Sequence, residues 1–129
     1  GGKGLWGRVF YPRAPFLTTL NASLDPVFVT CCTTGPDAQQ DGVYFIQATT
    51  YVSGEGPKHL IEPTFLSPYR HEAMPVNSPK LLSGIGLTPE KLSQLSFFGD
   101  VISDLLQKLE ARPVIVATPQ QQFAGYTQH

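Results

Sequence analysis

The sequence predicts an α/β domain built on a mixed β-sheet. Two features carry this prediction: three runs rich in β-branched and aromatic residues in the first half, and one strong helical periodicity followed by a short apolar run. An antiparallel meander followed by a helix and a further strand gives an α/β layer arrangement. With 129 residues, 41% of them hydrophobic, the chain is long enough for one core. We assign residues 1–24 to an arm or linker and residues 25–129 to the domain.

Turn residues separate the three expected strands. Residues 26–32 form a short apolar run that is typical of a buried strand, and turn chemistry at residues 33–37 ends it. Residues 43–52, rich in Tyr, Phe, Ile, Thr and Val, predict a longer strand. A tight loop at residues 53–57 leads to a third strand that begins at His59 and that Pro63 is expected to end.

Two helices are expected in the second half, after a proline-rich loop over residues 63–87. Thr88 can cap the first helix and Pro89 suits its first position, so this short helix should run to about Leu95. Apolar residues at helical spacing predict a second helix over residues 97–111, with Asp100, Asp104 and Lys108 outward. Residues 114–117 then read as a strand, buried on both faces if it lies in the middle of the sheet.

Charge and cysteine content restrict the function classes. A net charge of −1 and a pI of about 6.3 give no general attraction for nucleic acid. The two cysteines, Cys31 and Cys32, are adjacent and poorly placed for a disulfide, and on a strand one should face the core and the other the opposite side. A reducing, intracellular location (nuclear or cytoplasmic) is therefore expected. No apolar run is long enough to cross a bilayer, so no membrane association is expected.

Four segments in order resemble the DEDD-type (DnaQ-like, ribonuclease-H-like) 3′–5′ exonuclease family. Residues 27–35, Val-Phe-Val-Thr-Cys-Cys-Thr-Thr-Gly, resemble the family's strand that runs into Asp-x-Glu-Thr-Thr-Gly. Residues 86–92, Gly-Leu-Thr-Pro-Glu-Lys-Leu, are similar to the family's Gly-Ile-Thr-x-Glu-x-Leu. The meander at residues 41–63 and the final helix and strand are the other two segments. The resemblance implies a ribonuclease-H-like fold, with a mixed sheet, an antiparallel meander and flanking helices, that is incomplete at the C-terminus.

The resemblance also implies metal-assisted phosphodiester hydrolysis, for which the chain lacks the ligands. Two divalent ions would be held by carboxylates, and the first motif would supply two of these, one residue apart on one strand face. Thr30 and Cys32 occupy those positions, and Ala124 stands where the next acidic motif would place an aspartate. Neither a hydroxyl nor a soft thiol replaces a carboxylate toward Mg²⁺. Asp25, Asp37 and Asp41 are expected to serve turns rather than a metal, so we expect no metal site, no cofactor and no catalytic residue.

Binding functions remain open. The favoured expectation is a catalytically inactive exonuclease-like domain that serves as a protein-interaction or scaffold module within a larger protein, or that self-associates. A pseudo-nuclease that still binds single-stranded nucleic acid is one alternative, and an active 3′–5′ exonuclease with displaced ligands is another. Candidate binding residues are Thr33, Thr34 and Gly35, in the turn that would lie beside a terminal nucleotide, and Phe65 and Tyr69 in the proline-rich loop from Thr64 to Pro79.

Overall fold

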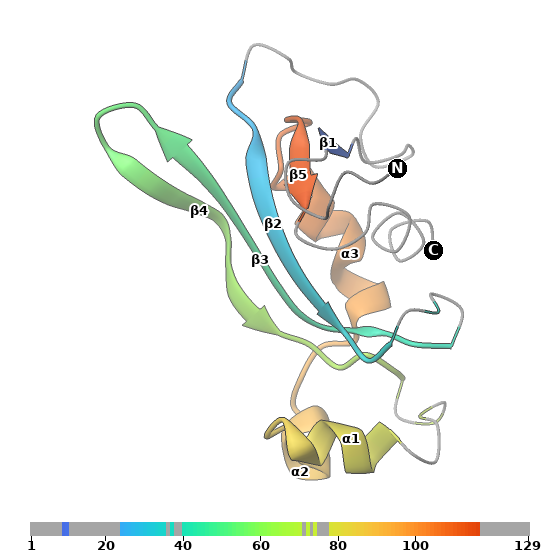
Figure 1. The fold of residues 1–129 in the computed structure, drawn as a ribbon. Coiled ribbons are helices and arrows are strands. Elements are labelled where there is room, and N and C mark those ends of the chain that lie inside the picture. The colour runs from blue at the N-terminus through green and yellow to red at the C-terminus, as the bar shows by residue number, and fades with distance from the viewer. Residues whose placement is uncertain are drawn as a thin grey trace, which may run out of the picture.

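The computed structural model describes residues 9–10, 24–35, 37, 40–70, 72, 74 and 78–116. Its centre is one five-stranded sheet with the strand order β1-β5-β2-β3-β4 (Figure 1). The strands are β1 (Val9–Phe10), β2 (Val27–Thr33), β3 (Val43–Val52), β4 (Gly56–Phe65) and β5 (Val114–Val116).

Strand direction confirms the predicted mixed sheet. β2, β3 and β4 form an antiparallel meander, whereas β5 pairs parallel to β2, with Val27 opposite Val114 and Val29 opposite Val116. Helix α3 (Phe98–Gln107) precedes β5 along the chain. β1, from the segment assigned to an arm, adds an antiparallel edge to β5. The chain is therefore an α/β domain in the part that the structure describes.

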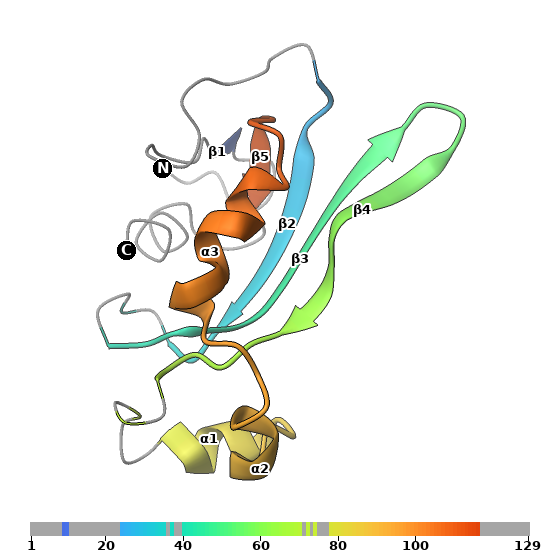
Figure 2. The same ribbon diagram turned by 180° about the vertical axis from the view of Figure 1, so that it is seen from behind.

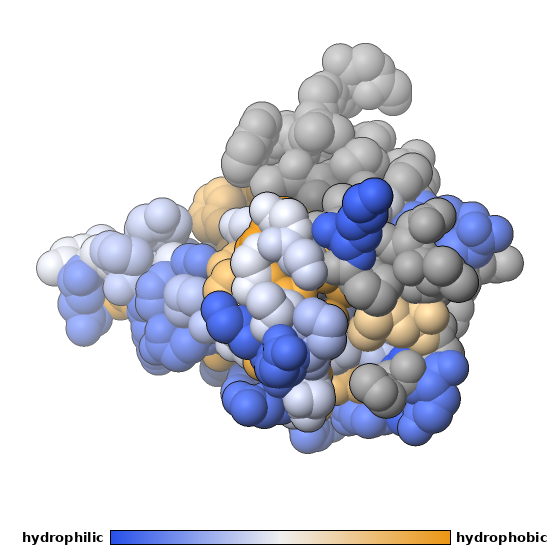
Figure 3. Space-filling view, turned by 90° about the horizontal axis from the view of Figure 1, so that it is seen from below, coloured by the Kyte–Doolittle hydropathy of each residue, from blue (hydrophilic) through white to orange (hydrophobic). Residues whose placement is uncertain are grey.

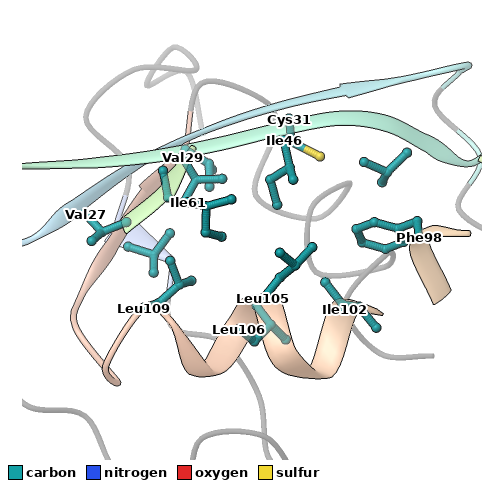
Figure 4. Close-up of a cluster of buried hydrophobic side chains, with 14 of the residues drawn as sticks. Val27, Val29, Cys31, Ile46, Ile61, Phe98, Ile102, Leu105, Leu106 and Leu109 are labelled. Atoms are coloured by element: carbon teal, nitrogen blue, oxygen red, sulfur yellow. The ribbon is translucent and has the colours of Figure 1, made fainter. Parts of the chain in front are cut away.

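Helix α3 covers one face of the sheet, and the main core lies between them (Figure 2). Alternation along β2 sends Val27, Val29 and Cys31 to this side, where they meet the apolar stripe of the helix (Figure 4). Burying one such aliphatic side chain contributes about 1.5 to 3 kcal/mol. The buried members are Val27, Val29, Cys31, Val43, Ile46, Ala48, Ile61, Leu66, Phe98, Ile102, Leu105, Leu106, Leu109, Val114 and Val116.

Strand β4 is longer than the sequence predicted. It begins at Gly56 and continues through Pro63 to Phe65, so the expectation that Pro63 ends it was wrong. The reason is its position at the edge of the sheet, where a residue without an N–H group can avoid losing a ladder hydrogen bond. The pairing with β3 is also irregular between Ile46 and Ala48, opposite the stretch that contains Pro63.

Strand β5 has one fully buried side. Val114 and Val116 are buried, but Ile115 is only half-buried, so the expectation of burial on both faces was wrong for this residue. Ala117, the predicted end of the strand, lies outside the described residues.

The helices differ from the prediction in extent. Thr88 caps α2 (Pro89–Leu92), and its Oγ1 accepts a hydrogen bond from the Lys91 N–H at 3.4 Å, as the sequence predicted. α3 keeps Asp100, Asp104 and Lys108 exposed as predicted, although it ends in turns after Gln107. None of the helices in the described part of the chain is long and apolar enough to cross a membrane.

A helix that the sequence did not predict, α1 (Ser78–Gly84), lies where a loop was expected. Its Leu82 is completely buried against Leu87 and Leu92 in a small second cluster, which Tyr44 and Met74 adjoin. This cluster lies under the end of the sheet, and seen from that end the surface is a mixture of hydrophilic residues and smaller hydrophobic areas (Figures 1 and 3). Packing against this cluster, rather than length, therefore stabilises α1.

Candidate functional site

The face of the sheet opposite α3 holds the positions where the exonuclease resemblance would place metal ligands. Thr30 and Cys32 lie on this face because β2 alternates, with Thr30 exposed and Cys32 half-buried. Cys31, between them, is buried in the core, so the prediction that the two thiols lie on opposite sides is confirmed. Burial, and then the neighbouring Cys32, raise the pKa of Cys31 to about 12, which leaves it a neutral thiol unsuited to nucleophilic chemistry.

One end of this face is aromatic and contains a predicted binding residue. Cys32 lies opposite Phe45 on β3, and Phe45 lies opposite Phe65 on β4. The Phe45 and Phe65 rings pack edge to face, with centroids 5.1 Å apart, and Phe65 is 52% exposed. The structure therefore joins Phe65 to the site through Phe45, which the sequence analysis did not single out.

The other end of the face carries a second aromatic pair. Phe28 and Tyr51 pack edge to face at 5.7 Å and are 41% and 56% exposed. Neither residue was predicted from the sequence to belong to a site. Strict alternation in β3 was the available signal, because Phe45, Gln47, Thr49 and Tyr51 share one side of that strand.

Uncharged polar groups lie between the aromatic pairs. Thr30 lies opposite Gln47, and the Gln47 Nε2 donates to Thr49 Oγ1 at 3.4 Å. Thr49 Oγ1 also shares a hydrogen bond of 2.9 Å with His59 Nδ1. We call this side of the sheet the open face and define it by Phe28, Thr30, Cys32, Phe45, Gln47, Thr49, Tyr51, His59, Phe65 and Ile115.

The open face has an unusual charge composition for a nuclease site. No lysine or arginine belongs to it among the described strand residues. Glu62, in the irregular stretch of edge strand β4, brings one exposed carboxylate to its rim. No helix in the described part of the chain packs on this face, since α3 lies on the other side (Figures 1 and 2).

The turn after β2 brings together four of the five predicted binding residues, but its polar groups form hydrogen bonds within the fold. Thr34 Oγ1 bonds to Asp41 Oδ1 at 3.1 Å and to the Tyr69 hydroxyl at 2.8 Å, and it accepts from Gly42 N at 3.0 Å. A hydroxyl has one donor and two acceptor positions, so Thr34 has none left for a ligand. Thr33 Oγ1 donates to Gly35 O at 2.9 Å. Through these hydrogen bonds the turn holds the meander and the loop after β4 together.

Neither the turn nor the open face holds a set of metal ligands in the described part of the chain. No group of three His, Cys, Asp or Glu side chains is clustered for metal binding among these residues. Asp41 takes part in the turn, where its Oδ2 accepts from Asp37 N at 3.0 Å. Ala124 lies outside the described residues.

A pocket of about 460 Å³ opens between the loop after β4, the end of α2 and the start of α3. Tyr69 and Arg70 line it, and the Arg70 guanidinium bonds to Asp100 at 2.8 Å and stacks over Phe97 at 4.7 Å from the ring centroid. Both charged groups are more than half exposed, so this ion pair contributes little to stability. The arginine is already neutralised, which makes the pocket a weak anion site.

No protein-family model matches the chain, and no curated protein is significantly similar to it in sequence.

Proposed function

We propose that this chain is a catalytically inactive, ribonuclease-H-like exonuclease domain that binds a protein partner through its open face. The observation that carries the proposal is the exposure of Phe28, Tyr51 and Phe65 on a strand face without lysine or arginine. Exposed apolar groups gathered on one face are typical of interaction surfaces.

The inactive, exonuclease-like part of the proposal is supported by topology and by two residues. A meander, a helix and a strand parallel to β2 agree with the fold that the sequence resemblance implies. Thr30 and Cys32 lie on one face at the spacing required of the family's first two carboxylates. A hydroxyl and a thiol at these positions remove two negative charges from any site for Mg²⁺, which prefers oxygen anions.

The charge distribution favours a protein over a nucleic acid as the partner. The ten acidic residues of the chain outnumber its nine basic residues, which gives a net charge of −1 and no general attraction for nucleic acid. Arg70 and Arg112 are in addition paired with acidic side chains. Aromatic rings can stack with bases, but phosphate binding requires cations that the open face lacks.

Site-specific photo-cross-linking tests this proposal. A photoreactive phenylalanine analogue replaces Thr30 on the open face, and in a matched control it replaces the exposed Lys91 on α2. We expect protein adducts from position 30 that are absent from position 91. Nucleic-acid adducts from position 30, or degradation of a labelled 3′ end in Mn²⁺ that requires the folded chain, would contradict the proposal.

A further inference from the structure

We infer that the partner of the open face is a second copy of this chain, packed face to face about a twofold axis. This inference rests on the proposed function and names its partner. It is independent of whether the domain once had nuclease activity.

The composition of the open face suits self-association. Among the described residues, the exposed large hydrophobic side chains are Phe28, Tyr51, Phe65 and Ile85, and all but Ile85 belong to this face. The polar residues between the aromatic pairs are uncharged amides and hydroxyls together with His59. Two copies can therefore meet without bringing like charges together at the centre, whereas a charged partner would find no ionic counterpart.

The arrangement of the open face is also self-complementary. Aromatic pairs occupy its two ends, and the row of Thr30 and Gln47 lies between them. A twofold axis that lies in the interface and crosses the strands near Gln47 would place Phe28 and Tyr51 over the other aromatic pair of the second copy. The same operation sets polar groups over polar groups, as an isologous interface requires. Two sheets pack in this way about 10 Å apart and within about 30° of each other.

The edges of the sheet disfavour the competing mode, in which strands of two copies pair side by side. β4 forms one edge, contains Pro57 and Pro63, and has two irregularities in its pairing. Prolines and bulges on an edge strand oppose strand addition. The strand at the other edge, β1, has two residues in the part of the chain that the structure describes. Association is therefore directed to the face.

The size of the open face indicates how strongly two copies should associate. Strands β2, β3 and β4 have 7, 10 and 10 residues, and at about 3.3 Å per residue and about 4.8 Å between strands they give a footprint of about 430 Å² per copy. A standard stable interface buries about 800 Å² per partner. We therefore expect a dissociation constant in the micromolar range or weaker, so that the dimer appears only as concentration rises.

Sedimentation equilibrium between about 1 μM and about 300 μM measures this association. The unmodified chain should show a monomer–dimer equilibrium, and Tyr51→Ser combined with Phe65→Ser should weaken it at least about tenfold. Ile85→Ser removes a side chain that is 45% exposed but outside the open face, and it should leave the equilibrium unchanged. Association that responds equally to both variants would overturn the inference.

A cross-link that leaves the aromatic residues intact provides the second test. Gln47→Cys, in a Cys32→Ser background, places a thiol near the twofold axis. Because the two sheets would lie about 10 Å apart, which is too far for a disulfide, a short bismaleimide and not simple oxidation should link the two copies into a covalent dimer. Lys91→Cys in the same background should not give this dimer. A chain that stays monomeric at the highest concentration, while position 30 cross-links to other proteins, refutes the second copy but leaves the proposed function standing. Single-strand binding at position 30 refutes both.

Discussion

Replacing Thr34 with valine tests whether the hydrogen bonds of the Thr34 hydroxyl, in the turn after β2, stabilise the folded chain. Valine keeps the shape of the side chain and removes its hydroxyl, which bonds to Asp41, Tyr69 and Gly42. The Asp41 carboxylate only accepts, so Thr34 donates to it, and the Gly42 N–H and the Tyr69 hydroxyl donate to Thr34. Three half-buried groups therefore lose their partner at once.

The expected cost is about 2 to 3 kcal/mol of unfolding free energy, because a neutral hydrogen bond contributes about 1 kcal/mol and one to a charged group more, with some relief from water at this half-buried site. Urea denaturation followed by circular dichroism measures this change. Tyr69→Phe removes a single donor and should cost about 1 kcal/mol. The double variant should lose about 1 kcal/mol less unfolding free energy than the sum of the two single variants, as expected for residues in contact.

Thr64→Val is the matched control. The Thr64 hydroxyl donates to Glu62 O at 2.6 Å, but this pair is exposed to water. Its loss should change the unfolding free energy by less than about 0.5 kcal/mol. If Thr34→Val lowers the unfolding free energy no more than Thr64→Val does, the hydroxyl of Thr34 does not stabilise the turn. It would then be available for a ligand, as the sequence suggested.

Three further predictions concern the core, a close contact and the thiols. Leu106→Ala, at a position that is 1% exposed, should lower the unfolding free energy by about 3 kcal/mol in urea denaturation, with the folded spectrum retained. Gly42→Ala should be still more destabilising, since its Cβ would lie 2.1 Å from the Pro68 carbonyl oxygen, and a native-like melting curve would contradict this contact. Maleimide at pH 8 should label Cys32 and spare Cys31 in the folded chain, as mass spectrometry of peptides can show, because burial raises the pKa of Cys31 from its ordinary value of 9.0 to about 12. The same shift favours the folded state below pH 9, and this contribution should decline as the pH rises from 9 toward 12 and be absent from Cys31→Ala.

The sequence was informative where one local pattern determines the structure. Aromatic and β-branched residues predicted β3 with both of its ends at Val43 and Val52, and the 3.6-residue period located α3. Two predictions that were based on prolines were wrong, namely the end of the third strand and the loop that was expected in place of α1. Pro63 lies within an edge strand that tolerates it, and α1 is a short helix whose stability depends on Leu82 packing against residues from a later segment. Neither the edge position nor that packing can be read from a local window.

The same distinction applies to the candidate site: features that follow from a local pattern could be predicted, and contacts between distant residues could not. The shared face of Thr30 and Cys32 follows from a period of two and was predicted correctly. The contact between Thr34 and Tyr69 joins residues that are 35 positions apart, so their hydrogen bond depends on the path of the whole meander. The aromatic residues of β3 could have been grouped by alternation, but their exposure depends on the location of α3, which covers only the other face.

The two neutral residues at the expected metal positions also suit the proposed association through the open face. Two carboxylates one residue apart would bind water strongly and would need metal ions to balance their repulsion. In a twofold dimer they would confront a second pair of carboxylates across an interface about 10 Å thick, where burial makes unpaired charge costly. Thr30 and Cys32 impose neither cost, and the exposed rings of Phe28, Tyr51 and Phe65 remain as the dominant contact groups. Under the proposed function, a hydroxyl and a thiol at these two positions therefore leave no electrostatic barrier to the pairing of two open faces.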